Sequence, residues 1–374
     1  MDEPLTILVA ARDEEGRIGE TVRALRAGFR DAEVIVADDG SRDGTADEAE
    51  AAGAIVLRLR RRGKGQALSA AERAAPPGRL LLVDADLRGD PGPLLESAAD
   101  LAVAAFARRQ GGGFGIARRT GAALIRLASG FDAREPLSGQ RALSPRARAA
   151  VFPLAPGFGC EVRMTIDAVR AGLELEEREL DLEHRATGRD PAGFAHRARQ
   201  LVDAVLGTAP LRLNYRGDRL PLVGAAFALV DVPTTLIGLA DDLWSGPERG
   251  FRAHLASGRT TGVLKLVGIP AVALARTRSL SGALLVGLAA NTLNQLDTRP
   301  GRALKTFLLC SSVLGLRSRR VVALAVLIAP YDLREMAMLG DAGSNALGAL
   351  LGYESVGKLR GAARWSVIGG LATL

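Results

Sequence analysis

Aromatic residues are scarce in this sequence, and together they make up only 4% of its 374 residues. Proteins that bind single-stranded nucleic acid usually stack bases on aromatic side chains inside a basic groove. The net charge is +7, yet no segment interleaves basic with aromatic residues. We therefore expect no nucleic acid partner, and we assign the excess positive charge to contact with anionic membrane lipid.

Cysteine and histidine are also rare, with two and three residues respectively. Cys160 and Cys310 are far apart and have no metal-binding companion at short spacing. This usage favours a reducing compartment over a disulfide scaffold. The chain opens with an acidic stretch, and the apolar run after it has only the length of a strand, so we expect no secretory signal peptide.

The chain is longer than one typical hydrophobic core requires, and its pattern of apolar and charged residues changes near residue 215. We therefore predict two domains, 1–215 and 216–374. In the first half, short apolar runs alternate with amphipathic helical patterns. This rhythm predicts parallel strands joined by right-handed crossovers. The expected strands cover residues 5–11, 33–39, 54–60 and 79–86.

Two acidic clusters follow predicted strands, Asp38-Asp39 and Asp84-Ala85-Asp86. Parallel strands end at one edge of the sheet, so both clusters should meet there, beside the turn at residues 63–65. Like charges gathered in this way need a compensating cation, and Mg²⁺ or Mn²⁺ bridging a diphosphate would supply it at Asp84 and Asp86. Asp38 and Asp39 suit hydrogen bonds from a base imide or a ribose hydroxyl. We therefore predict a nucleotide lying across this edge.

Four segments, in this order, resemble the motifs of the family 2 glycosyltransferases: VAARDEEGRIGETVRAL, VIVADDGSRDGTAD, RGKGQAL and LLLVDAD. The resemblance implies the GT-A fold, a Rossmann-like α/β domain with a mostly parallel sheet. It also implies a nucleoside diphosphate sugar as donor and Mg²⁺ or Mn²⁺ as cofactor. The roles implied by position are nucleoside binding for Ala10, Glu14, Asp38 and Asp39, a place near the nucleotide for Lys64, and metal and diphosphate binding for Asp84 and Asp86.

Two later segments resemble the acceptor side of the same family: residues 131–145 resemble its short turn followed by a strand, and residues 157–168 resemble the glutamate-bearing helix start that comes next. An inverting displacement at the anomeric carbon needs a base opposite the leaving diphosphate when the acceptor is a hydroxyl. Glu161 is the first candidate for this base, and Asp132 is the second. Alternatively, Glu161 is a helix N-terminal carboxylate stabilised by the helix dipole. A phosphate acceptor is already ionised and would need no base.

The segment EHRATGRDPAGFAHRARQ, residues 183–200, resembles the tail of sugar transferases that act on polyprenyl phosphate or phosphoglycerate-type acceptors. The resemblance suggests that His184 completes the metal site of Asp84 and Asp86, with an ordinary surface or packing histidine as the alternative. Arg185 and Arg189 are suited to holding phosphate oxygens by bidentate contacts.

After residue 218, long apolar segments with few charges and many small residues follow. Several approach the length of a bilayer span, so we predict an all-α, multi-helix membrane domain. The alternative is a soluble helical domain with an apolar core. Three polar clusters interrupt these segments, namely Asp241-Asp242, the group Asn291, Asn294 and Asp297, and residues 340–344 around Asp341.

These clusters, in GLADDLWSG, NTLNQLD and LGDAGSNALGALLG, resemble those of the polyprenyl-phosphate phosphoglycosyl transferases. The resemblance implies that Asp241, Asp242, Asp297 and Asp341 converge on a metal. However, the histidine-rich loop of that family is absent, and a single membrane crossing before Asp241 would separate it from cytosolic nucleotide sugars. We therefore expect a mainly structural role, with binding of a lipid acceptor.

Taken together, the sequence predicts a glycosyltransferase at the cell membrane, with its first domain in the cytoplasm. It would move a sugar from a UDP- or GDP-sugar to a lipid-linked or phosphorylated acceptor, polyprenyl phosphate among them. Two alternatives remain open. One is a bifunctional protein with phosphoglycosyl transferase activity in its second half, and the other is a non-catalytic scaffold that binds nucleotide sugars.

Overall fold

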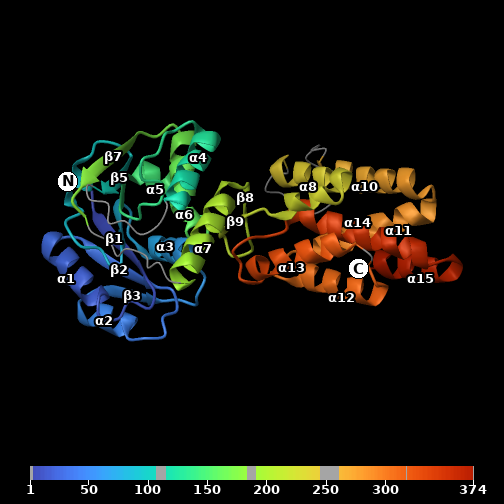
Figure 1. The fold of residues 1–374 in the computed structure, drawn as a ribbon, viewed down its shortest axis with the longest axis horizontal. Helices are drawn as coiled ribbons and strands as arrows, with labels where there is room; N and C mark the ends of the chain where they lie inside the picture. Colours follow the sequence, from blue (N-terminus) through green and yellow to red (C-terminus); the bar gives the residue numbers. More distant parts are fainter. Residues whose placement is uncertain (1–2, 107–114, 183–190, 245–260, 317, 374) are drawn as a thin grey trace. The chain divides into compact units, whose positions relative to one another are not determined.

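The computed structural model describes residues 3–106, 115–182, 191–244, 261–316 and 318–373. The chain divides into two compact units (Figure 1). Unit 1 comprises Met1–Ala209 with Gly217–Arg219, and unit 2 comprises Pro210–Arg216 with Leu220–Leu374. The division therefore falls within a short hairpin, formed by β8 (Leu211–Leu213) and β9 (Arg219–Pro221).

Unit 1 is built on a seven-stranded sheet with the order β3-β2-β1-β4-β6-β5-β7. The strands are β1 (Leu5–Ala11), β2 (Glu33–Asp38), β3 (Ile55–Arg58), β4 (Arg79–Asp84), β5 (Leu101–Phe106), β6 (Arg141–Leu143) and β7 (Leu175–Leu180). All neighbouring pairs are parallel except those of β6, which runs antiparallel to both β4 and β5. The predicted α/β fold with a mostly parallel sheet is confirmed. Periodicity gives no sign of β6, because three residues are too few to show a strand period, and only the resemblance of residues 131–145 to a turn followed by a strand indicates it.

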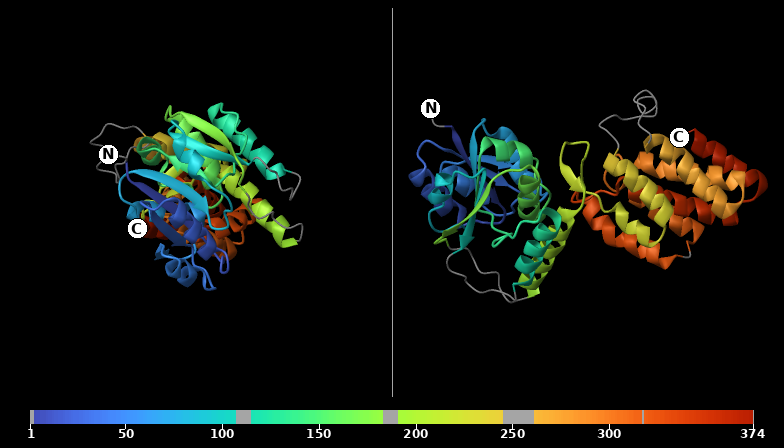
Figure 2. Two further views of the ribbon diagram at one scale, coloured as in Figure 1. Left: turned by 90° about the vertical axis from the view of Figure 1, so that its left-hand side faces the viewer. Right: turned by 90° about the horizontal axis from the view of Figure 1, so that it is seen from above.

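Helices cover both faces of this sheet, and Figure 2 shows it from two further directions. The helices α1 (Ile18–Gly28) and α2 (Thr45–Ala51) pack on one face, and α3 (Lys64–Ala74), α5 (Pro145–Val151) and α6 (Gly159–Arg170) pack on the other. Along β1, Val9 belongs to the same buried cluster as Val22 of α1, whereas Leu8 belongs to the cluster on the other face with Leu68 of α3. Each such side chain contributes about 1.5–3 kcal/mol by its removal from water. This two-sided burial explains why the strands read as continuous apolar runs.

Two further helices, α4 (Ile116–Ser129) and α7 (Pro191–Thr208), pack against α6 through an additional small core. Ile125 of α4, Ile166 of α6 and Ala204 of α7 meet there. These contacts hold α6 in place, and its first turn carries the predicted site residue Glu161.

The register of β1 aligns the strand ends that form the candidate site. Ala10 lies beside Ala37 on one side and Asp84 on the other, and Ala11 lies beside Asp38. The strands β1, β2 and β4 therefore end at the same level. As expected for parallel strands, their carboxyl ends form one edge at which a ligand can bind.

Unit 2 is helical. Its elements are the 3₁₀ helix η2 (Gly224–Leu229) and the helices α8 (Val232–Trp244), α10 (Thr261–Thr277), α11 (Leu280–Leu296), α12 (Arg302–Leu314), α13 (Arg319–Leu333), α14 (Gly340–Lys358) and α15 (Gly361–Ala372). Helix α14 is central and packs against α8, α11 and α12. At Gly348 a Cβ atom would lie 2.4 Å from the carbonyl oxygen of Ala289, so only glycine lets α14 and α11 approach this closely.

The helical character predicted for the second half is confirmed, but the prediction of a membrane domain is wrong. No helix in the described part of the chain is both long enough and apolar enough to cross a membrane. The apolar stretch 220–240 does not form a single helix, because η2 ends before Asp231 and α8 begins after it. Asp231 is buried and pairs with Arg276 at 2.9 Å. The predicted location at the cell membrane is corrected accordingly.

Candidate functional site

The two adjacent acids at the end of β2 have different partners. Asp38 accepts hydrogen bonds from the backbone N–H of Ser41 at 3.0 Å and from the Ser41 hydroxyl, and so closes the turn after the strand. Asp39 accepts hydrogen bonds from the backbone N–H groups of Arg62, at 2.6 Å, and of Gly63, at 2.9 Å. Burial raises the pKa of Asp39, although these amides and the nearby Arg12 oppose the shift. Asp39 thus ties the end of β2 to the loop that precedes α3.

Lys64, the first residue of α3, lies between two carboxylates. Its Nζ is 2.6 Å from Asp84 Oδ1 and 2.7 Å from Glu161 Oε1. Burial alone would lower the pKa of Lys64, but the attraction of Asp84 and Glu161 outweighs it, and the pKa is raised. The site therefore holds a fixed positive charge at neutral pH. The ends of β4, α3 and α6 meet at this ammonium group.

The second oxygen of Asp84 is also engaged. Asp84 Oδ2 accepts a hydrogen bond of 2.9 Å from Nε2 of Gln140, a fully buried residue just before β6. Sequence reasoning missed Gln140, since a single glutamine outside any periodic pattern carries no signal of its own.

Asp86 lies in the turn after β4, which Thr21 of α1 anchors by donating to the Ala85 carbonyl at 2.7 Å. Asp86 is half-buried, and its carboxylate has no hydrogen bond or ion pair with any residue that the structure describes. An unengaged carboxylate beside Asp84 is a suitable donor for Mg²⁺ or Mn²⁺, which prefer oxygen ligands. In the same part of the chain, no three His, Cys, Asp or Glu side chains surround a metal position. Beyond Asp84 and Asp86, a metal here would take its remaining donors from outside the described residues, for example from the oxygens of a diphosphate.

Other predicted residues have the following places. Ala10 is half-buried in β1 beside Asp84. Glu14 follows β1, where its N–H donates to Thr45 Oγ1 at 2.7 Å and its carboxylate pairs with Arg17 at 2.7 Å. The residues His184, Arg185 and Arg189 lie outside the described part of the chain.

The two candidate bases are placed differently. Glu161 is 3% exposed in the first turn of α6, where one oxygen pairs with Lys64 and the other accepts from the Cys160 thiol at 3.1 Å. Asp132 is exposed and pairs with Arg126 at 3.3 Å. No contact among the described residues joins Asp132 to Lys64 or to the carboxylates around it. A base role therefore stays a prediction for both.

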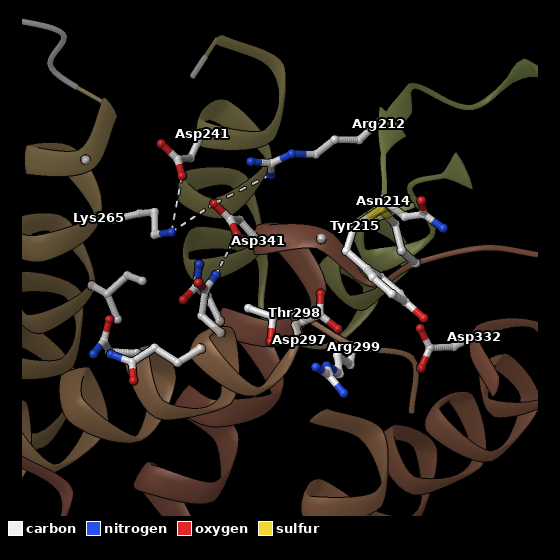
Figure 3. A pocket seen from close by; sticks show the side chains of 18 of the residues that line it. Arg212, Asn214, Tyr215, Asp241, Lys265, Asp297, Thr298, Arg299, Asp332 and Asp341 are labelled. Carbon is white, nitrogen blue, oxygen red and sulfur yellow. Dashed lines mark hydrogen bonds and ion pairs between the residues drawn. The ribbon is translucent and has the colours of Figure 1, made fainter. Parts of the chain in front are cut away.

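Unit 2 contains a separate cavity of about 830 Å³ (Figure 3). The predicted polar residues Asp241, Asn291, Asn294, Asp297 and Asp341 all line it. They come from α8, from the end of α11 and from the start of α14. The three polar clusters, which are distant in sequence, thus meet at one site.

Cations and amides surround the carboxylates of this cavity. Lys265 Nζ lies 3.2 Å from Asp241 Oδ2 and 2.9 Å from Asp341 Oδ2, as Figure 3 shows. Asn294 donates to Asp341 Oδ1 at 2.6 Å. Burial and the proximity of Asp341 raise the pKa of Asp241, whereas Asp241, Lys265 and Arg212 together outweigh the effect of burial on Asp341 and lower its pKa. Lys265 and Arg212 therefore both offset the charge of Asp341.

Asp242 has a structural role beside the cavity. Its two oxygens accept the backbone N–H groups of Asp341 and Ala342, each at 2.9 Å, and Arg212 lies 2.7 Å from it. Burial, followed by the nearby Asp341, raises the pKa of Asp242 to about 6. Asp242 thus caps the start of α14, where a negative charge is favourable.

Two buried polar atoms of cavity-lining residues have no hydrogen-bond partner among the described residues. They are Asp241 Oδ1 and Asn345 Nδ2. Buried polar groups are usually hydrogen-bonded, so these two atoms can bond a polar group of a ligand in the cavity. The same cavity is also lined by apolar side chains, those of Leu266, Ile269, Leu284 and Leu288. The cavity therefore suits a ligand with both polar and apolar parts.

Comparison with known proteins places the first unit among sugar transferases. Residues 6–107 match the family model "Glycosyl transferase family 2". Glycosyltransferase AglJ of Haloferax volcanii is 31% identical over 170 residues, which are 41% of this chain and 56% of that protein. Glucosyl-3-phosphoglycerate synthase of Mycolicibacterium paratuberculosis is 31% identical over 239 residues, which are 54% of this chain and 71% of that enzyme.

Solved structures of glucosyl-3-phosphoglycerate synthase from Mycobacterium tuberculosis are also similar. The complex with phosphoglyceric acid is 25% identical, with a TM-score of 0.46, over 55% of this chain and 80% of that one. The complex with Mn²⁺, UDP-glucose and phosphoglyceric acid is 24% identical, with a TM-score of 0.46, over 59% of this chain and 87% of that one. Neither of the two curated relatives is named as a phosphoglycosyl transferase, so the resemblance seen in residues 220–352 gains no support from them.

Proposed function

We propose that this chain, which belongs to the family 2 glycosyltransferases, transfers a sugar from a UDP- or GDP-sugar to a phosphorylated acceptor. The observation that carries the proposal is the set of residues at the carboxyl edge of the sheet. Asp39, Lys64, Asp84 and Asp86 come from separate segments and meet at the ends of β2 and β4 and the start of α3. This edge is where parallel α/β sheets bind nucleotides.

In the proposed donor complex, Asp39 accepts a hydrogen bond from the base, and Lys64 donates to the diphosphate. Asp86, with Asp84 beside it, holds Mg²⁺ or Mn²⁺. When bound, the metal neutralises the charge that develops on the leaving diphosphate. The relative solved with Mn²⁺ and UDP-glucose carries this kind of cofactor.

The acceptor that we propose to test first is 3-phosphoglycerate, because a relative is named for its glucosylation. Its reacting group is a hydroxyl, so the proton must pass to a base as the oxygen attacks the anomeric carbon. Glu161 remains the first candidate and Asp132 the second, and the expected outcome is inversion. Polyprenyl phosphate attacks through an ionised oxygen and needs no base.

A donor panel tests the proposal directly. The purified chain is incubated with UDP- and GDP-sugars, Mg²⁺ or Mn²⁺, and either acceptor, and the released nucleoside diphosphate is measured. We expect turnover with at least one donor and a loss of about 100-fold or more in Asp86→Ala. Full activity of Asp86→Ala would contradict the assignment. Nucleotide binding without turnover for any donor would favour the scaffold.

A second candidate function concerns the cavity of unit 2. We propose that it binds polyprenyl phosphate, because its lining combines the cations Lys265 and Arg212 with apolar side chains. If this site also catalyses phosphosugar transfer, a UDP-sugar and polyprenyl phosphate should yield UMP instead of UDP. UMP release that survives Asp86→Ala but is lost in Asp341→Ala would establish a bifunctional enzyme.

A further inference from the structure

The carboxylate of Asp84 is held at both of its oxygens. Lys64 lies 2.6 Å from Oδ1, and the side-chain amide of Gln140 donates to Oδ2 at 2.9 Å. We infer that Gln140 is a positioning residue for the donor diphosphate, because through Asp84 it fixes the ammonium group of Lys64. The inference rests on the proposed function, in which Lys64 contacts the diphosphate.

The orientation of the Gln140 amide is set by its neighbours. The Ser138 hydroxyl lies 3.4 Å from Gln140 Oε1 and donates to it, which leaves the NH₂ group directed to Asp84. Gln140 is fully buried, and its backbone carbonyl accepts the N–H of Ala104 at 3.0 Å. A buried amide bonded at both ends has little freedom to rotate.

Arg141 holds the loop that carries Ser138 and Gln140. This arginine is fully buried, and its guanidinium donates to the carbonyls of Ser138, at 2.8 Å, and Pro136, at 3.4 Å. It also donates to Thr165 Oγ1 at 3.0 Å, one turn beyond Glu161 on α6. A buried charge is costly unless hydrogen-bonded, so these bonds fix the loop strongly. One network therefore joins the loop that contacts Asp84 to the helix that carries Glu161.

The loop also closes over Asp84. A Cβ atom at Gly139 would lie 2.4 Å from Asp84 Oδ1 and 2.5 Å from Oδ2, so the backbone passes directly against the carboxylate. Asp84 and Glu161 occupy two of the three donors of the Lys64 ammonium group. The third donor remains for a phosphate oxygen, and its direction is set by the other two.

The test compares ligands with and without phosphates. Gln140→Met keeps the size of the side chain and removes the donor to Asp84. Calorimetry with Mn²⁺ would measure the affinity for UDP and for uridine, with GDP and guanosine in parallel. Loss of one hydrogen bond to a charged group predicts about 10- to 100-fold weaker UDP binding, with uridine binding within about twofold of wild type.

Two further variants sharpen the test. Gln140→Glu places a second carboxylate against that of Asp84, and their repulsion should weaken UDP binding more than Gln140→Met does. Ser138→Ala removes only the hydroxyl that orients the Gln140 amide, so it should weaken UDP binding less. The matched control is Ser97→Ala, which removes another buried serine hydroxyl of unit 1, one bonded to Glu176. This control should leave both affinities unchanged.

Distinct outcomes overturn the two proposals. Unchanged UDP affinity in Gln140→Met, or an equal loss of UDP and uridine affinity, would overturn the positioning role. If Gln140→Met does not fold, unchanged UDP affinity in Ser138→Ala has the same consequence. A wild-type chain that binds neither UDP nor GDP would overturn the proposed function and this inference with it.

Discussion

The ammonium group of Lys64 lies 2.6 Å from Asp84 and 2.7 Å from Glu161, two carboxylates that are 77 residues apart in sequence (161 minus 84). One comes from the end of a strand and the other from the first turn of a helix. The contact therefore links the fold to the chemistry that we propose, because the cation that holds these elements together also faces the nucleotide edge.

Lys64→Met is expected to destabilise unit 1. It leaves two carboxylates close together with their main cation removed, and breaking a buried pair in this way costs about 3 kcal/mol. The measurement is the free energy of unfolding in urea. The double variant Lys64→Met with Glu161→Gln should recover part of the loss, since one of the uncompensated charges is then absent. Equal stability of the single and double variants would show that Lys64 does not compensate Glu161.

The nucleotide edge could be predicted from the sequence because it depends on local patterns. Continuous apolar runs end in Asp38-Asp39 and in Asp84, and the rule that parallel strands end at one edge places these acids together. Gln140 could not be predicted in this way. It reaches Asp84 only because the short antiparallel β6 inserts between β4 and β5, and three residues give no period to detect.

The second half shows a different limit of sequence reasoning. Asp241, Asn294 and Asp341 were recognised as polar interruptions, and they do line one cavity. The membrane prediction failed because alanine- and glycine-rich apolar segments are equally typical of closely packed buried helices. Close approaches such as Gly348 against Ala289 need small residues in either setting. Composition alone does not distinguish the two.

Glu161→Gln tests the proposed base. With 3-phosphoglycerate as acceptor, loss of a general base predicts a decrease in kcat of about 100-fold or more, because such catalysis typically contributes that much. Because Glu161 also pairs with Lys64 at 2.7 Å, UDP affinity is measured in the same variant, and a decrease in kcat with saturating donor separates the catalytic effect from a binding effect. Asp132→Asn is the companion variant and should stay close to wild type, since Asp132 is exposed and pairs only with Arg126 among the described residues. The reverse pattern would exchange the two assignments.

Gly139→Ala should disable the site through a single methyl group. Its Cβ atom would meet both oxygens of Asp84 at 2.4 and 2.5 Å, so the carboxylate or the loop must move. We expect donor turnover to decrease at least about tenfold, together with a loss of stability of about 1–3 kcal/mol. The control is Gly28→Ala at the end of α1, where a Cβ atom meets nothing within 4 Å. Wild-type turnover in Gly139→Ala would show that the contact is not tight.

Asp332 should make the stability of unit 2 depend on pH. It is 3% exposed on α13, and its carboxylate accepts the N–H of Gly301 at 2.7 Å. Burial raises the pKa of Asp332 from 3.8 to about 6, although the Gly301 hydrogen bond and Lys305 oppose the shift. The folded state therefore binds the Asp332 proton more tightly than the unfolded state does. As the pH increases from about 4 to about 6, the folded state must give up this proton, and stability decreases.

Asp332→Asn removes this titration while keeping an oxygen that can accept from Gly301. A pKa shift of about two units corresponds to at most about 3 kcal/mol of stability. Between pH 4 and pH 7, the free energy of unfolding of Asp332→Asn should therefore decrease by about 1–3 kcal/mol less than that of wild type. Part of the pH dependence should remain, because the pKa of Asp242 is also raised to about 6. The measurement is the urea midpoint at each pH, with Asp31→Asn, at an exposed position of unit 1, as control. Identical pH dependence in Asp332→Asn and wild type would mean that Asp332 is ionised in the folded protein throughout this range.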